Sequence, residues 1–224
     1  MITIENIDTY GWEAAIRGMR NPMNSWDKSD SGWKLSPGIN DNILVNYEYE
    51  GDCAYAVGPE DAQLMKNLVA AGTDHSKFMR QIGVSMDITA PLYWWKEFDT
   101  YKVGTTANSC STMHKIHEKR FEREDLSIEH IHNCEEHHWM VTMDNIISSL
   151  NAAREKYLET KDKEYWWQMI QLLPSSYNQK RTVTLNYAVL RNQYHARKNH
   201  KLDEWRNYCQ CIETMLPYFE LITM

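Results

Sequence analysis

The spacing of apolar residues changes along this 224-residue chain, and the change restricts the folds open to it. Over residues 78–89, apolar side chains recur at every second position, which is typical of a β-strand. From Glu135 onward they recur at three- and four-residue spacing, which is typical of amphipathic helices. The sequence therefore predicts a strand followed by a helical second half, with helices over residues 135–160, 163–173, 183–198 and 202–216.

The first part of the chain predicts shorter elements. Residues 2–4 begin a strand, and residues 11–19 form a helix that gathers its apolar side chains on one face. Residues 21–42 show little periodicity and predict a long loop, which is of functional interest because long ordered loops are uncommon. The remaining predictions are a strand over 43–49, a helix from Gly58-Pro59 to a stop at Gly72, an aromatic helix over 92–101, and a small, polar, ligand-facing loop over 103–111.

Length and composition narrow the class of protein. The length suits one domain with a sizeable core, so we predict a single domain over residues 1–224. The net charge of −7 argues against binding to a nucleic-acid polymer but allows a local basic pocket for a phosphate. No apolar run approaches 18 residues, so no membrane span is expected. The start does not resemble a signal peptide, and the five cysteines include no C-x-x-C, so we expect a reducing, cytoplasmic location.

Two further features of the composition each allow more than one interpretation. The nine tryptophans and thirteen tyrosines suit a core and an oligomer interface, or the stacking of some rings on a planar ligand. Residues 130–138 are rich in side chains that can ligate metals, although their order fits no known zinc pattern, and we favour a solvated polar helix start with no metal site. These side chains are His130, His132, Cys134, Glu135, His137 and His138.

Two stretches carry a distinctive set of motifs. The first runs from Ala90-Pro91 through Leu92-Tyr93-Trp94-Trp95-Lys96-Glu97-Phe98 to Asn108-Ser109-Cys110-Ser111-Thr112-Met113-His114. The second begins at Leu173-Pro174. The basic residue Lys180 lies six residues after Pro174, and a Thr-x-Asn motif ends at Asn186, twelve residues after Pro174. Arg197 lies eleven residues after Asn186.

Together these stretches resemble the flavin-dependent thymidylate synthases. In that family an Ala-Pro, an aromatic helix start and Arg-Gln precede the signature R-H-R-x-x-S-x-N-E-x-S-x-R-Y. Here Lys96-Glu97 stands in place of Arg-Gln, and Thr100-Tyr101-Lys102 occupies the Arg-His-Arg region. From Thr106 onward the spacing matches, with identities at Asn108 and Ser111. His75 matches a histidine that the family has sixteen residues before the proline. The resemblance covers roughly residues 74–111 and 173–205.

The resemblance implies a fold and an activity. The fold is α+β, with a small central β-sheet and long packed helices, in a homotetramer whose interfaces form the sites. The activity is the methylation of dUMP to dTMP, or a related pyrimidine-nucleotide C5 transfer, using folate, FAD and NADPH. The alternative is a nucleotide-binding protein on the same scaffold that has lost flavin catalysis, and a structural or regulatory oligomer is a third hypothesis because fold does not fix function.

The resemblance also assigns site residues. Arg197 is the candidate catalytic residue and also binds substrate, together with Glu97, Ser109, Ser111 and Lys180. The candidate cofactor-binding residues are His75, Lys102, Asn108 and Asn186. Without the resemblance, the two basic residues read as solvated cations, the serines as turn formers, and Asn186 as a cap on a neighbouring turn.

Two departures from the family pattern bear on the ligands. Met113 stands where the family has an arginine, which removes a charge and five hydrogen-bond donors from the expected nucleotide site. The Arg-His-Arg region retains Lys102 as its one basic residue. We therefore expect FAD binding that is weak or lost.

Overall fold

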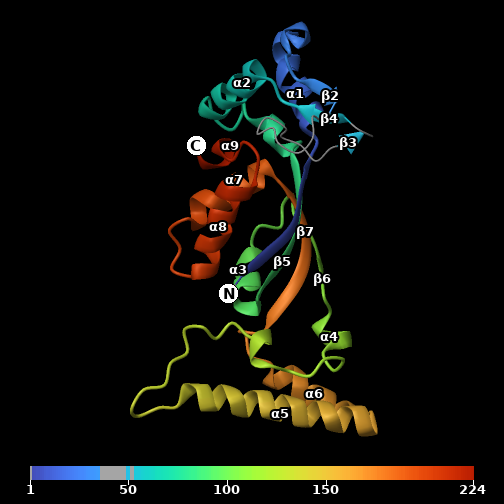
Figure 1. The fold of residues 1–224 in the computed structure, drawn as a ribbon, viewed down its shortest axis with the longest axis vertical. Helices are drawn as coiled ribbons and strands as arrows, with labels where there is room; N and C mark the ends of the chain where they lie inside the picture. The colour runs from blue at the N-terminus through green and yellow to red at the C-terminus, as the bar shows by residue number, and fades with distance from the viewer. Residues whose placement is uncertain (1, 36–48, 51–52) are drawn as a thin grey trace. The chain divides into compact units, whose positions relative to one another are not determined.

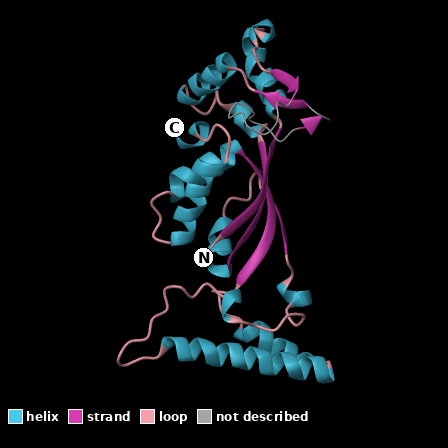
Figure 2. Cartoon of the chain, in the orientation of Figure 1, coloured by secondary structure: helices cyan, strands magenta, loops and turns pink. Residues whose placement is uncertain are grey.

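A computed structural model of the protein describes residues 2–35, 49–50 and 53–224. Its strands form a four-stranded sheet of order β1-β5-β7-β6 and a three-stranded antiparallel sheet of order β2-β4-β3 (Figure 2). The strands are β1 (Thr3–Tyr10), β2 (Gly32–Leu35), β3 (Tyr49–Glu50), β4 (Cys53–Ala56), β5 (Gly83–Pro91), β6 (Thr106–Ser109) and β7 (Asn178–Asn186).

The helices outnumber the strands among the described residues and include the longest elements. They are α1 (Trp12–Arg20), α2 (Pro59–Ala70), α3 (Leu92–Phe98), α4 (Thr112–Lys115), α5 (Trp139–Thr160), α6 (Lys163–Leu172), α7 (Tyr187–Arg197), α8 (Asp203–Met215) and α9 (Glu220–Thr223) (Figure 1). The predicted α+β class, with small sheets and long helices, is confirmed. Among the described helices, none has the combination of length and apolar character that crossing a membrane requires.

The chain separates into two compact units. The first unit comprises residues up to 3 together with 88–100 and 108–181, and the second comprises residues 4–87, 101–107 and 182–224. The single domain expected over residues 1–224 stays a prediction.

The first unit is built around a pair of helices, α5 and α6, which lie side by side (Figure 1). Lys161 ends α5 in a left-handed conformation, and the carboxylate of Asp162 caps α6 by accepting the amide N–H of Glu164. On α5, the side chain of Asn151 exchanges two hydrogen bonds with the backbone of Phe121. The apolar core there comprises Ile116, Phe121, Leu126, Met143, Ile147, Leu150, Ala153 and Met169.

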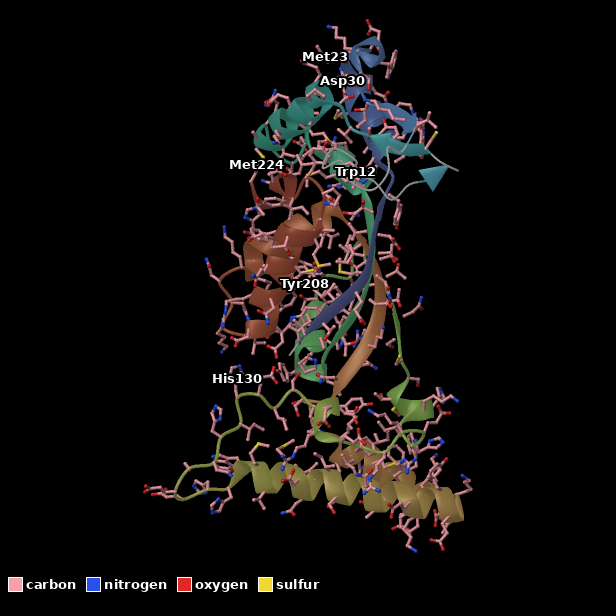
Figure 3. All side chains as sticks on the ribbon, viewed as in Figure 1. Trp12, Met23, Asp30, His130, Tyr208 and Met224 are labelled. Atoms are coloured by element: carbon pink, nitrogen blue, oxygen red, sulfur yellow. The ribbon has the colours of Figure 1, made fainter. Side chains whose placement is uncertain are left out.

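The second unit is held together by buried aromatic side chains and one buried ion pair. The ring of Trp12 on α1 lies 5.3 Å from that of Tyr187, and the ring of Trp205 lies 5.7 Å from that of Tyr208, both pairs in edge-to-face contact. Trp12 and Tyr208 are labelled in Figure 3. The ion pair joins Arg20 to Asp61. Many of the chain's aromatic residues are thus core residues.

The helix predictions hold where apolar spacing is long and uninterrupted. The face predicted for α1 is buried, and α2 stops before Gly72, whose φ of +107° is in the left-handed region. The helix predicted over 183–198 is wrong in its first turn, because residues up to Asn186 belong to β7 and α7 starts at Tyr187. The strand predicted over 78–89 begins only at Gly83, after a 3-10 turn at Lys77–Arg80.

Two predicted loops contain strands. Residues 103–111 include β6, whose side chains are all exposed, and residues 21–42 include β2 and two short 3-10 turns. The strand predicted over 43–49 lies outside the described residues except for its last position, which begins β3.

Candidate functional site

A small pocket in the first unit brings two of the predicted site residues together. Its volume is about 140 Å³. It is formed by the segment that links β6 to α4 and by the start of β7, and it includes both Ser111 and Lys180. The lining residues are Cys110, Ser111, Thr112, Lys115, Ile116, Tyr177, Asn178, Gln179 and Lys180.

Gln179 fixes the two walls of this pocket against each other. Its buried side-chain amide donates to the carbonyl oxygen of Cys110 at 2.8 Å, and the amide N–H of Cys110 donates to the carbonyl of Lys180 at 2.9 Å. The carbonyl of Gln179 in turn accepts the indole N–H of Trp95 at 2.9 Å. The pocket is therefore preorganised by the strand pairing and by the aromatic core of α3.

Arg181 supports the same wall and was missed from the sequence. Its Nε donates to Oε1 of Gln179 at 3.0 Å, and its Nη1 donates to Oδ1 of Asp99 at 2.8 Å. The guanidinium carbon lies 4.2 Å from the ring centroid of Trp95, which is a cation–π distance. Successive strand residues point to opposite faces, so recognition of β7 as a strand would have separated the roles of Lys180 and Arg181.

The other residues predicted in this unit lie outside the pocket lining. Ser109 and Asn108 are exposed on β6, and Glu97 is half-buried on α3. Ser111 is at the pocket and also caps α4, since its Oγ accepts the amide N–H of His114 at 3.0 Å. Within this pocket the structure thus unites Ser111 and Lys180 and leaves Glu97, Asn108 and Ser109 apart.

The pocket contains two lysines and a protonated phenol. Lys115 lines it together with Lys180, although Lys115 was not predicted as a site residue. Burial raises the pKa of Tyr177, so its hydroxyl stays protonated at neutral pH and remains a hydrogen-bond donor. Two ammonium groups and several hydroxyl donors make a set that suits an oxyanion such as a phosphate.

Arg197 belongs to an aromatic cluster in the second unit. It is the last residue of α7. Its Nε donates to the hydroxyl of Tyr101 at 3.0 Å, and its guanidinium carbon lies 4.8 Å from the ring centroid of the buried Trp205. These contacts fix the plane of the guanidinium, while neighbouring Lys102 is exposed.

Asn186 and His75 also lie in the second unit. Asn186 is the N-cap of α7, where its Oδ1 accepts the amide N–H of Val189 at 3.1 Å, so its interpretation as a cap describes the observed contact. Gly104 has a φ of +77°, and a Cβ there would lie 3.2 Å from the side-chain amide of Asn186. His75 is exposed and follows the end of α2.

The histidine-rich stretch lies on the loop before α5, where Figure 3 labels His130, so the helix start expected at residue 135 is wrong and the helix begins at Trp139. His137 stacks on Trp139 at 4.7 Å between ring centroids. Two other histidines line an open, largely apolar pocket of about 510 Å³ together with Trp139. Across the part of the chain that the structure describes, no group of three or more His, Cys, Asp or Glu side chains is arranged to hold a metal ion.

Among known proteins, this chain is similar to solved structures in fold and matches no sequence family. No family model matches the sequence, and no curated protein matches it. A crystal structure of the flavin-dependent thymidylate synthase ThyX from Helicobacter pylori, complexed with FAD and dUMP, superposes with a TM-score of 0.68 at 15% identity and covers 99% of this chain and 97% of that one. A second structure of the Helicobacter pylori enzyme with FAD and dUMP gives 0.66 at 14% identity, over 99% and 95%. The expected fold of the flavin-dependent thymidylate synthases is therefore confirmed.

Proposed function

We propose that this protein binds a pyrimidine nucleotide such as dUMP, with the 5′-phosphate in the pocket at Ser111 and Lys180. The observation that carries the proposal is that these two residues, 69 positions apart in sequence, line one preorganised pocket. A volume of about 140 Å³ suits a phosphate group, whereas complete ligands of drug size occupy roughly 300–1,000 Å³. The base and ribose would then extend beyond this pocket.

The chemistry of the lining supports a phosphate. At neutral pH a phosphate monoester carries about 1.5–2 negative charges, and its oxygens accept strong charge-assisted hydrogen bonds. The ammonium group of Lys180 supplies a point charge, and the hydroxyl of Ser111 supplies a donor. We also propose that Arg197 is a catalytic residue that binds a nucleotide, because its guanidinium is oriented in advance by Tyr101 and Trp205.

The second candidate function is the complete reaction, in which dUMP is methylated to dTMP with folate, FAD and NADPH. The shared fold favours it, since both solved relatives are complexed with FAD and dUMP. Residues 100–102, which occupy the Arg-His-Arg region, do not fit the pyrophosphate of FAD. Among residues 100–102 only Lys102 is basic, and the hydroxyl of Tyr101 is engaged by Arg197. We therefore propose no flavin step. As part of the proposed function, we also propose that the protein is a homotetramer in the cytoplasm. Its subunit interfaces would complete the sites through Glu97, Asn108 and Ser109. Any cofactor would lie near His75 and Asn186.

The variant Lys180→Gln tests the phosphate pocket. We expect it to weaken dUMP binding about 10- to 100-fold, because one charge-assisted hydrogen bond is worth roughly 1.5–3 kcal/mol. Isothermal titration calorimetry gives the affinity. Lys156→Gln, on α5 and outside the pocket, is the control and should bind as the wild type does. Equal affinities of the wild type for uridine and dUMP would rule out a phosphate role.

The variant Arg197→Lys tests whether geometry matters beyond charge. We expect dUMP affinity to fall about tenfold, because lysine lacks the planar fork and the stacking surface that Tyr101 and Trp205 orient. The control is Arg206→Lys, which alters an exposed arginine of the same unit that is paired with Asp203. Retention of full dUMP affinity by Arg197→Lys in the same titration would exclude Arg197 from the nucleotide site.

A further inference from the structure

The structure offers a replacement for the cation that the sequence lacks at Met113. The side chain of Met113 is about half exposed and does not line the phosphate pocket, while its carbonyl accepts the indole N–H of Trp166 at 3.0 Å. Two residues further on, Lys115 does line the pocket, on the same short segment as Ser111. A positive charge is therefore present at the pocket, displaced along the chain from the family's position.

The backbone of α4 directs Lys115 to the side where Ser111 lies. The amide N–H of Lys115 donates to the carbonyl of Ser111 at 3.2 Å, so the two residues are one helical turn apart and share a face. Ile116, next in sequence, is buried in the core of the first unit and anchors this turn. Lys115 and Lys180 thus reach the pocket from its two walls.

Lys115 forms an ion pair with a carboxylate of the same chain. Its ammonium group pairs with Oε1 of Glu118, three residues later, and the two side chains are 65% and 56% exposed. The backbone of Glu118 is held because its carbonyl accepts a hydrogen bond from Nη2 of Arg154 at 3.1 Å. Exposed pairs of this kind are worth little, so a ligand with about two negative charges in the pocket can displace the carboxylate.

We propose that Lys115 is the second cation of the phosphate pocket, and that Glu118 competes with the ligand's phosphate for it. Binding then exchanges one partner of Lys115 for another, and the carboxylate of Glu118 lowers the affinity of the empty pocket for any oxyanion. The two lysines would bind inorganic phosphate by the same contacts as the phosphate of a nucleotide. The inference therefore rests on the proposed function for the identity of the ligand.

Two variants are expected to act in opposite directions. Lys115→Gln should weaken binding of inorganic phosphate and of dUMP by about tenfold, through loss of one charge-assisted contact. Glu118→Gln should tighten both by about two- to fivefold, because it removes the competing charge and keeps the shape of the side chain. Both side chains are exposed, so the fold should tolerate both substitutions.

A matched pair on α5 supplies the control. Lys156 and Glu159 form an exposed i,i+3 ion pair in the same unit, away from the pocket, so Lys156→Gln and Glu159→Gln should leave both affinities unchanged. The full chain is titrated calorimetrically with inorganic phosphate and, separately, with dUMP.

The outcomes separate this inference from the proposed function. The inference is overturned if Lys115→Gln leaves the affinities for phosphate and dUMP unchanged. It is also overturned if Glu118→Gln weakens them or leaves them unchanged. In either case the proposed function stands if dUMP still binds. Phosphate binding that responds to both variants, in a protein that shows no preference for dUMP, supports the inference and refutes the proposed nucleotide. A wild type that binds neither phosphate nor dUMP overturns both.

Discussion

Replacement of Asp61 by Ala is expected to lower the free energy of unfolding by about 3–5 kcal/mol, because it leaves a buried arginine without its counter-charge. The carboxylate of Asp61 is fully buried and lies 2.6 Å from Nε of Arg20, whose side chain is 6% exposed. Its second oxygen accepts hydrogen bonds from Ser29 Oγ and from the hydroxyl and amide of Ser31. Urea denaturation followed by circular dichroism measures the loss.

An exposed ion pair provides the comparison for Asp61→Ala. Arg123 and Asp144 form a bidentate pair in which both side chains are exposed, so Asp144→Ala is expected to lower the free energy of unfolding much less than Asp61→Ala does. Similar losses in the two variants would show that burial does not govern the contribution of Asp61.

The pair formed by Arg20 and Asp61 also predicts how stability depends on pH. Burial by itself raises the pKa of Asp61, but hydrogen bonds from Ser29, Ser31 and Arg20, with the charge of Arg20, outweigh it and hold the pKa below its ordinary value of 3.8. A lowered pKa stabilises the folded state fully above the unfolded pKa and loses that effect as the pH falls through the folded pKa. The stability gap between wild type and Asp61→Ala should stay constant from about pH 5 to 8 and narrow below about pH 4.

The purified protein is expected to bind FAD several orders of magnitude more weakly than a protein with a complete Arg-His-Arg set. Two or three missing charge-assisted bonds, at roughly 1.5–3 kcal/mol each, account for this loss at about tenfold per 1.4 kcal/mol. Of residues 100–102, which occupy the Arg-His-Arg region, Lys102 is the one cation. The hydroxyl of Tyr101 in the same region already accepts a hydrogen bond from Arg197. Calorimetric titration of the flavin-free protein with FAD measures the affinity.

Titration of the same preparation with dUMP serves as the control for that experiment, because it shows that the protein is folded and competent to bind. Sub-micromolar affinity for FAD, together with NADPH-dependent conversion of dUMP to dTMP, would contradict the expectation. The protein would then be an enzyme that holds its flavin through contacts other than the Arg-His-Arg region.

The sequence predicted those elements whose apolar spacing has one interpretation. Helix α5 has 22 residues, and over that length a helical period cannot be mistaken for a strand. Strand β7 was missed because Val183, Tyr187 and Leu190 are four and three residues apart, which imitates a helix, while the period-two series through Leu185 is short. Asn186, a preferred N-cap residue, was the local signal for the true helix start.

The candidate site was predictable only where it depends on spacing along the chain. Ser111 and Lys180 came from motif positions, and the pocket contains both. Lys115, Tyr177 and Arg181 were missed because their importance depends on which residues fold against them. No local sequence pattern predicts that Lys115, two residues after Met113, lines the pocket.

The locality of the phosphate pocket has an evolutionary consequence. All of its lining residues come from two short stretches, 110–116 and 177–180, within one compact unit. Of the residues that the family resemblance associates with the cofactor, Asn108 belongs to the same unit, and His75, Lys102 and Asn186 belong to the other. Substitutions in the pocket lining are therefore confined to one unit, and selection can act on that lining as a local set. A lineage that no longer needs flavin chemistry can let the cofactor contacts drift while the pocket lining is maintained.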